Sequence, residues 1–297
     1  MIRLGMHSFT EQIPFTPGTP SVEASWAFNA YPGLGLRESV ERVLAQKRRG
    51  VRPILRIDYA PGQVCPPNDV GCRDFLTEVV GVLSEFPEMR EVDISPFNEP
   101  NLNAEGAFPA EHVAKCTQEF IDQFPGHRVW VCATLAHGSE VAERTPPAHI
   151  EQSPWSAYFF RLLFHLNERG VAPHGFLLHG YARPGQLFSP EGWRFSYNII
   201  ETWNECLRHF PVYRNKPVVI SEWNCRTGGQ TTADQYKSGQ LARDLMYTGQ
   251  VFGHRADSFC VFVGRHDNVW TDDSLLAPRG RCIGMRAEYD YLKAAGF

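Results

Sequence analysis

Short apolar runs alternate with longer amphipathic runs along almost the whole chain of 297 residues, and this alternation constrains the fold most. The apolar runs have the length of buried strands. The longer runs repeat apolar residues at steps of three and four, as a helix packed on a sheet requires. Strands that alternate with helices pair in parallel, with each helix as a crossover. The pattern therefore predicts the α/β class.

Seven strands are clear, and an eighth is needed to close a (β/α)8 barrel. The clear strands are expected at 2–9, 52–59, 91–97, 128–135, 175–181, 217–223 and 258–264. Helices are expected at 36–50, 72–86, 109–124, 156–170, 195–210 and 232–249. The only apolar candidate for a degenerate second strand is 24–31. A doubly wound open sheet is the rival, but no Gly-rich phosphate loop follows the first strand. We predict a single (β/α)8 TIM barrel domain over 1–297.

Charge and hydropathy exclude several classes of partner. The formal net charge of −4 and the scattered basic residues provide no footprint for nucleic acid. No apolar run approaches 18 residues, which predicts that the chain does not span a membrane. No leader precedes the first strand pattern, so a cytoplasmic protein and a mature exported form both stay open. The pattern does not indicate an oligomeric state.

The eight cysteines do not form a disulfide scaffold, and they lack paired C-x2-C ligand sets. We therefore expect no structural zinc site. Cys132 and Cys260 fall in apolar strand patterns and are expected in the core. Cys65 and Cys72 flank the loop "CPPNDVGC", where a disulfide stays open as an alternative. Such a disulfide would favour an exported protein.

Polar and aromatic residues gather where the predicted strands end, which is where a barrel carries its chemistry. They are Arg56, Asp58, Asn98, Glu99, His179, Tyr181, Glu222, Trp223, Asn224, His266, Asp267 and Trp270. Two of the carboxyl groups, Glu99 and Glu222, lie about three strand–helix units apart. They are expected on opposite sides of the barrel mouth.

Such a pair suits cleavage of a glycosidic bond. One carboxylic acid protonates the leaving oxygen while a carboxylate attacks or shields the anomeric carbon. The two must titrate differently, and Arg56 and Tyr181 are candidates to favour the ionised form of Glu222. Alternatively, Arg56 simply neutralises Asp58 or Asp93 at the barrel rim.

The sequence resembles the clan A glycoside hydrolases, which are retaining enzymes built on (β/α)8 barrels. The resemblance rests on "FNEPN" ending the fourth strand, "ISEWN" ending the seventh and "LHGY" ending the sixth, with a tryptophan after the eighth. It implies that Glu99 is the acid/base and that Asn98 binds the sugar 2-hydroxyl. Glu222 corresponds to the nucleophile, and His179 and Tyr181 to the sixth-strand His-x-Tyr whose tyrosine contacts it.

Four further residues are expected to bind substrate. Arg56 corresponds more weakly to an orienting arginine, because the clan carries that residue on its second strand. Trp270 is expected to be the platform under the sugar, and Trp223 and Asn224 to line the cleft. The resemblance implies no metal and no organic cofactor.

The expected activity is retaining hydrolysis of β-linked oligo- or polysaccharides by double displacement, cut internally. An exo-acting β-glycosidase is the runner-up, since loops such as 8–36 and 182–193 are long enough to close a cleft. A non-catalytic carbohydrate-binding barrel is a further alternative. Metal-dependent hydrolysis is disfavoured, because the first strand has no H-x-H and the chain has no H-E-x-x-H.

Overall fold

The computed structural model describes residues 3–7, 24–131, 154–182, 203, 207–225, 249–250 and 252–261. The chain forms two compact units. The first consists of Met1–Trp26, His179–Glu201 and Pro217–Phe297, and the second of Ala27–Leu178 and Thr202–Lys216. The single domain expected over 1–297 stays a prediction.

Strands and helices alternate along the described chain in the predicted order. The strands are β1 (Arg3–His7), β2 (Ala24–Ala30), β3 (Arg52–Ile57), β4 (Asp93–Pro96), β5 (Trp130–Val131), β6 (Gly175–Ala182), β7 (Val218–Cys225) and β8 (Ala256–Val261). The described α-helices are α1 (Leu36–Arg48), α2 (Asp69–Ser84), α3 (Ala110–Gln123) and α4 (Pro154–Glu168). Short 3₁₀ turns are η1 (Pro87–Glu91), η2 (Asn103–Glu105), η3 (Pro211–Tyr213) and η4 (Gly253–Arg255). The candidate second strand is confirmed as β2.

Boundaries differ from the expected ones in a few places. Helix α2 begins at Asp69 rather than at residue 72, because the side chain of Asn68 accepts a hydrogen bond from the Gly71 N–H and caps the helix. The helix expected at 232–249 lies almost entirely outside the described residues, as does most of the one expected at 195–210. Cys260 is buried in β8 as predicted, whereas Cys132 lies outside the described residues.

In the second unit the strands pair in parallel. Arg56 of β3 lies opposite Ser95 of β4, and a parallel bridge joins Ile94 to Val129 just before β5. Trp130 of β5 in turn lies opposite Gly175 of β6. Because the pairing is parallel, the carboxyl ends of β3 and β4 lie at the same edge.

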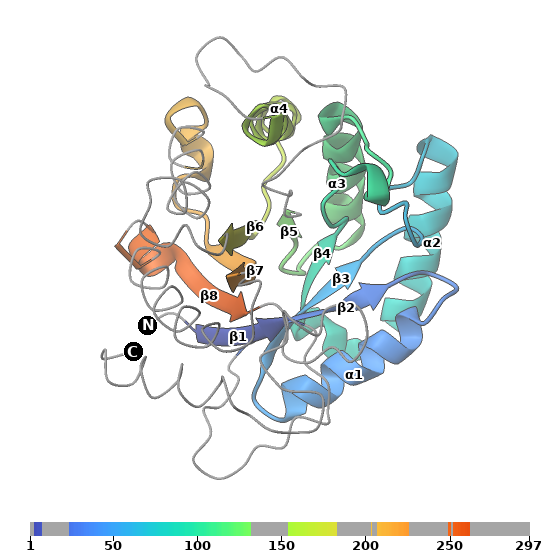
Figure 1. The fold of residues 1–297 in the computed structure, drawn as a ribbon. Coiled ribbons are helices and arrows are strands. Elements are labelled where there is room, and N and C mark those ends of the chain that lie inside the picture. Colours follow the sequence, from blue (N-terminus) through green and yellow to red (C-terminus); the bar gives the residue numbers. More distant parts are fainter. Residues whose placement is uncertain are drawn as a thin grey trace, which may run out of the picture. The chain divides into compact units, whose positions relative to one another are not determined.

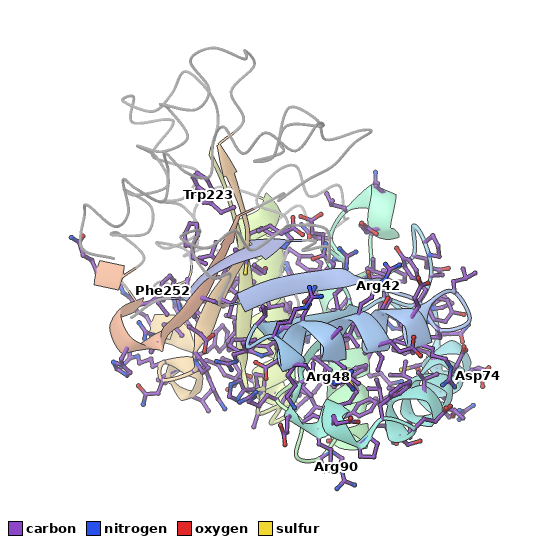
Figure 2. All side chains as sticks on the ribbon, turned by 90° about the horizontal axis from the view of Figure 1, so that it is seen from below. Arg42, Arg48, Asp74, Arg90, Trp223 and Phe252 are labelled. Carbon is purple, nitrogen blue, oxygen red and sulfur yellow. The ribbon has the colours of Figure 1, made fainter. Side chains whose placement is uncertain are left out.

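Helices α1, α2 and α3 follow one another along the outer side of β3 and β4 (Figure 1). Helix α1 shows why, since its apolar residues Val40, Val43 and Leu44 are buried while Glu38 and Arg42 pair at 2.5 Å on its exposed side. Charged side chains such as Asp74 of α2 and Arg90 of η1 extend outward from this unit (Figure 2). None of the described helices has both the length and the apolar character to cross a membrane.

In the first unit, β1 pairs in parallel with β2 on one side and with β8 on the other, and β8 pairs with β7. The register between β7 and β8 shifts near the end of β7. Ile220 lies opposite Phe259 but Trp223 lies opposite Val261, so β7 carries one extra residue there. Such a β-bulge bends a strand and redirects its side chains.

Candidate active site

The chain leaves β4 through a turn with a strained backbone. Phe97 and Glu99 both have positive φ, at 58° and 46°. This left-handed conformation costs a residue other than glycine roughly 1–3 kcal/mol, and such strain gathers at functional sites. The turn carries Asn98 and Glu99 at the carboxyl end of β4, as the sequence predicts.

Aromatic packing holds this turn in place. The ring of Phe97 is buried between helices α2 and α3, with its centroid 5.9 Å from that of Phe75 and 6.4 Å from that of Phe120. The Phe97 N–H donates to the carbonyl of Ile57 at 3.1 Å, which joins the turn to the end of β3. Core packing therefore supports a conformation that the local sequence alone disfavours.

Asp58, which follows β3, connects this turn to Arg56. Its Oδ1 accepts a hydrogen bond from the Asn98 N–H at 2.9 Å, and its Oδ2 accepts one from Arg56 Nε at 2.5 Å. Burial raises the pKa of Asp58, while the Arg56 guanidinium and the Asn98 N–H act in the opposite direction. The carboxyl group thus fixes the backbone position of Asn98.

The pairing with Asp58 confirms the simpler interpretation of Arg56. Its guanidinium also lies 3.8 Å from the Glu105 carboxylate, so two carboxylates of its own unit surround it. A role of Arg56 beside Glu222 stays a prediction. From the sequence, Asp58 was expected at a strand end as a partner for Arg56, and its contact with the Asn98 N–H was not predicted. The R-x-D spacing at the end of the strand is the sequence signal for the Arg56–Asp58 pair.

The side chain of Asn98 is ready to accept a hydrogen bond. Asn98 is only 3% exposed, and its Oδ1 has no partner among the residues that the structure describes. A buried amide oxygen without a partner costs about 1–3 kcal/mol. A ligand hydroxyl at this position would remove that cost.

In the first unit, the ends of β6 and β7 bring His179 and Glu222 together. His179 Nε2 lies 3.5 Å from Glu222 Oε1, and both side chains are buried. Glu222 lies within the bulged part of β7, where the extra residue alters which side chains face inward.

Gly180 of β6 lies against β7. A Cβ added to Gly180 would lie 3.4 Å from Ile220 Cγ2 and 3.6 Å from the Trp223 ring, which is ordinary van der Waals contact. Trp223 is 1% exposed, with its ring centroid 5.8 Å from that of Phe259. Its expected contact with substrate stays a prediction.

The remaining expected site residues are not described in full. Tyr181 lies in β6 and Asn224 in β7, but their side chains fall outside the described residues. Trp270 lies outside them altogether, as do His266 and Asp267. Their roles stay predictions.

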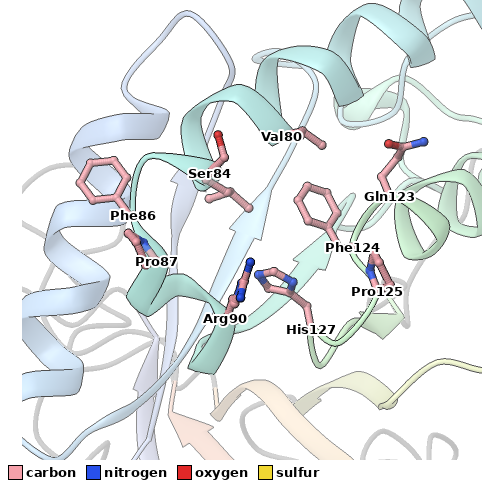
Figure 3. Close-up of a pocket in the computed structure, with 10 residues that line it drawn as sticks. Val80, Ser84, Phe86, Pro87, Arg90, Gln123, Phe124, Pro125 and His127 are labelled. Atoms are coloured by element: carbon pink, nitrogen blue, oxygen red, sulfur yellow. The ribbon is translucent and has the colours of Figure 1, made fainter.

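A separate pocket of about 300 Å³ lies at the opposite end of the second unit. It is lined by the carboxyl ends of α2 and α3 and by η1, and Arg90 and His127 lie side by side in it (Figure 3). Burial, and then the charge of Arg90, lower the pKa of His127. Since these helix ends lie beside the amino ends of the strands, the pocket is remote from the turn after β4.

No protein-family model matches the chain, and no curated protein is significantly similar to it in sequence. Solved structures do match. A GH128 (subgroup II) endo-β-1,3-glucanase from Sorangium cellulosum has a TM-score of 0.59 and 18% identity, covering 93% of this chain and 91% of that one. A GH128 (subgroup III) curdlan-specific exo-β-1,3-glucanase from Blastomyces gilchristii, solved with glucose, has a TM-score of 0.59 and 12% identity, covering 97% of both chains.

A GH39 β-xylosidase from Caulobacter crescentus also matches, with a TM-score of 0.61 and 15% identity, covering 99% of this chain and 71% of that one. At such identities the likeness shows the fold, and the (β/α)8 barrel of the α/β class predicted from the sequence is confirmed. The neighbours are glycoside hydrolases, in agreement with the resemblance to clan A.

Proposed function

We propose that this protein is a retaining glycoside hydrolase that cleaves β-1,3-linked glucans internally. One observation carries the proposal: in a (β/α)8 fold, Glu99 follows β4 in a strained turn, and Glu222 lies buried in the bulged part of β7. In this fold all strands open their carboxyl ends onto one face, where the active sites lie. Two such carboxyl groups are the minimum equipment for glycoside hydrolysis.

In the proposed mechanism Glu222 attacks the anomeric carbon while Glu99 protonates the departing glycosidic oxygen. Glu99 then removes a proton from water, which attacks the same carbon and releases the sugar with its original configuration. Retention requires the two carboxyl groups to lie about 5–5.5 Å apart. Two neighbouring side chains assist in this mechanism. His179 orients Glu222, and the Asn98 amide oxygen accepts a hydrogen bond from the sugar.

The structural neighbours support the choice of substrate class. Endo-β-1,3-glucanases are among them, which favours internal cleavage of a β-1,3-glucan. The alternative of exo action also has support, since one neighbour is an exo-β-1,3-glucanase and another a β-xylosidase. The two modes differ in the size of the first products.

The test is to incubate the protein with laminarin, curdlan, laminaripentaose and the aryl β-glycosides of glucose and xylose. Reducing ends report cleavage, and chromatography reports product size. We expect mixed oligosaccharides from laminarin and curdlan, and loss of activity by about 10⁴-fold or more in Glu222→Gln. Glu78→Gln, on the exposed side of α2, is the matched control and is expected to keep full activity. Release of glucose alone would support exo action.

Two outcomes would overturn the proposal. If no substrate on the panel is cleaved, but wild type and Glu222→Gln bind laminaripentaose equally, the protein is a binding barrel. If Glu222→Gln cleaves as fast as wild type, the assigned nucleophile is wrong.

A further inference from the structure

Three cysteines and one histidine meet in the second unit, on the side of the β3 and β4 carboxyl ends. Cys65 lies in the loop after β3, Cys72 in the first turn of α2, and His112 and Cys116 in the first two turns of α3. One ligand atom each from Cys65, His112 and Cys116 lie within 4.8 Å of one another. The thiol of Cys72 also interacts with that of Cys116 but lies outside this group of mutually close atoms, so it is the fourth candidate ligand.

The cysteines of this Cys65–Cys72–His112–Cys116 cluster are buried and are not in disulfides. The disulfide that the sequence left open between Cys65 and Cys72 is therefore not formed. Buried polar side chains usually have a hydrogen-bond partner or bind an ion. Three buried thiols beside an imidazole are the side chains that commonly bind a soft metal ion.

We propose that the cluster binds one Zn²⁺ ion in a closed, tetrahedral Cys3His site with a structural role. Thiolates and imidazole are the ligands that zinc takes in structural sites, and four protein ligands leave no position for a substrate. With Zn–S at about 2.3 Å and Zn–N at about 2.0 Å, neighbouring ligand atoms lie about 3.5–3.8 Å apart. His112 Nε2 and Cys116 Sγ are already about this far apart, whereas the Cys72 thiol has to move closer to the other ligands.

The helices and the loop after β3 bring the candidate ligands close together. His112 and Cys116 are four residues apart on α3 and therefore share one face of that helix. His112 Nε2 lies 3.6 Å from Cys116 Sγ. Cys65 and Cys72 approach from the loop that leads into α2, so the four ligands come from three separate segments.

Metal binding would change the charge of the cluster. Zinc coordinates thiolates rather than thiols, so its binding releases the thiol protons. Lys115 and Glu119 border the cluster and pair with each other at 4.0 Å, which places both signs of charge around it.

One contact must change on binding. His112 Nε2 lies 2.6 Å from the Pro66 carbonyl oxygen, so coordination through this nitrogen exchanges the carbonyl for the ion. The imidazole has room to do so, because His112 is only half-buried and borders an open surface depression of about 710 Å³.

The ion would stabilise the loops that carry the candidate active site. Val64, next to Cys65, donates its N–H to the Glu105 carbonyl at 3.1 Å and accepts one from Tyr59 at 2.8 Å. Zinc bound at Cys65 would therefore hold the β3–α2 loop against η2, which follows the turn after β4. This inference does not depend on the reaction that the protein catalyses.

The test is the metal content of the whole protein, expressed with added zinc and purified under reducing, chelator-free conditions. Mass spectrometry of the wild type is expected to give about one zinc per chain. Cys65→Ser and Cys116→Ser are each expected to lower zinc affinity at least about tenfold. Cys260→Ser, which alters a buried cysteine in the first unit, is the matched control and should keep its zinc.

A second measurement on the wild type guards against variants that fail to fold. Replacing zinc by Co²⁺ should produce the intense visible absorption of tetrahedral thiolate-bound cobalt. Wild-type protein that holds no zinc and gives no such absorption would overturn the inference. A peptide map with a disulfide between any two of Cys65, Cys72 and Cys116 would do so too, as would full zinc content in both serine variants.

Discussion

The two ends of the β3–β4 pair handle a buried aspartate in opposite ways. At the amino end, Asp93 is fully buried and accepts hydrogen bonds from Arg52 at 2.8 Å, Trp130 at 3.0 Å and Arg128. Every oxygen of this carboxylate has a donor, and the strand around it is regular. These hydrogen bonds satisfy the buried carboxylate without a ligand.

At the carboxyl end, Asp58 is equally buried, but its neighbours are strained or incompletely satisfied. Phe97 and Glu99 have positive φ, and the Asn98 amide oxygen lacks a partner among the described residues. Strain and unsatisfied groups of this kind persist where function requires them. Under the proposed function, the amino end of the pair serves stability and the carboxyl end serves chemistry.

Among changes at the two ends of the β3–β4 pair, Glu99→Gln at the carboxyl end has the largest expected effect. The amide keeps the shape of the side chain but cannot transfer a proton, so kcat/KM should fall about 10²–10⁴-fold. The free energy of unfolding should stay within about 0.5 kcal/mol of wild type. Glucan hydrolysis and urea denaturation measure the two quantities, and a variant of wild-type rate would remove Glu99 from the mechanism.

Phe97→Ala is expected to affect both properties. Loss of the buried ring should lower the free energy of unfolding by about 3–5 kcal/mol. It should also loosen the turn, so that the folded molecules hydrolyse glucan more slowly than wild type. Phe124→Ala is the control, because Phe124 packs on Phe120 at 4.8 Å without belonging to the turn. It should lose stability and keep its rate per folded molecule. Equal rate losses in the two variants would show that the turn has no special part.

The same substitution at the two ends, Asp93→Asn and Asp58→Asn, should have different effects on stability and on the rate of hydrolysis. Asp93→Asn leaves two arginines without their charge partner and should lower the free energy of unfolding by about 2–3 kcal/mol, with an unchanged rate per folded molecule. Asp58→Asn misplaces Asn98 and should slow hydrolysis by about 10²-fold. Thermal unfolding and kinetics on both variants test this, and a reversed pattern would break the comparison.

The smallest expected effect is a gain in stability. Glu99→Gly removes the penalty of a positive φ and should raise the free energy of unfolding by about 1 kcal/mol while abolishing activity. Glu99→Ala, which keeps the strained backbone, should show no such gain. Equal stabilities for these two variants would mean that the turn stores no strain.

The sequence predicted the parts of this molecule that periodic patterns and local motifs encode. Alternation of strands and helices identified the class. Asn98 and Glu99 follow the end of β4 as predicted, whereas Glu222 lies inside β7, which continues to Cys225. The eight-strand count also held, because Ala24–Ala30 forms a strand despite its weak pattern.

The parts that were missed depend on contacts between distant segments. Nothing in the sequence shows that Glu99 adopts positive φ, because glutamate has no preference for that conformation. The turn is held by the packing of the buried Phe97 ring, which depends on distant segments. The Cys65–Cys72–His112–Cys116 cluster was missed for a similar reason. A search for close cysteine pairs overlooks side chains that come together only when the loop after β3 and helices α2 and α3 pack against one another.

The central claim is that Glu222 is the nucleophile and Glu99 the acid/base of one retaining site. The most direct test is azide rescue of Glu222→Ala and Glu99→Ala on an activated aryl β-glucoside, with the anomeric configuration of each glucosyl azide determined by NMR. The account predicts the α-azide from Glu222→Ala, by one direct displacement, and the β-azide from Glu99→Ala, by interception of the glycosyl-enzyme. The opposite assignment, the same anomer from both variants, or the absence of any rescue would contradict it.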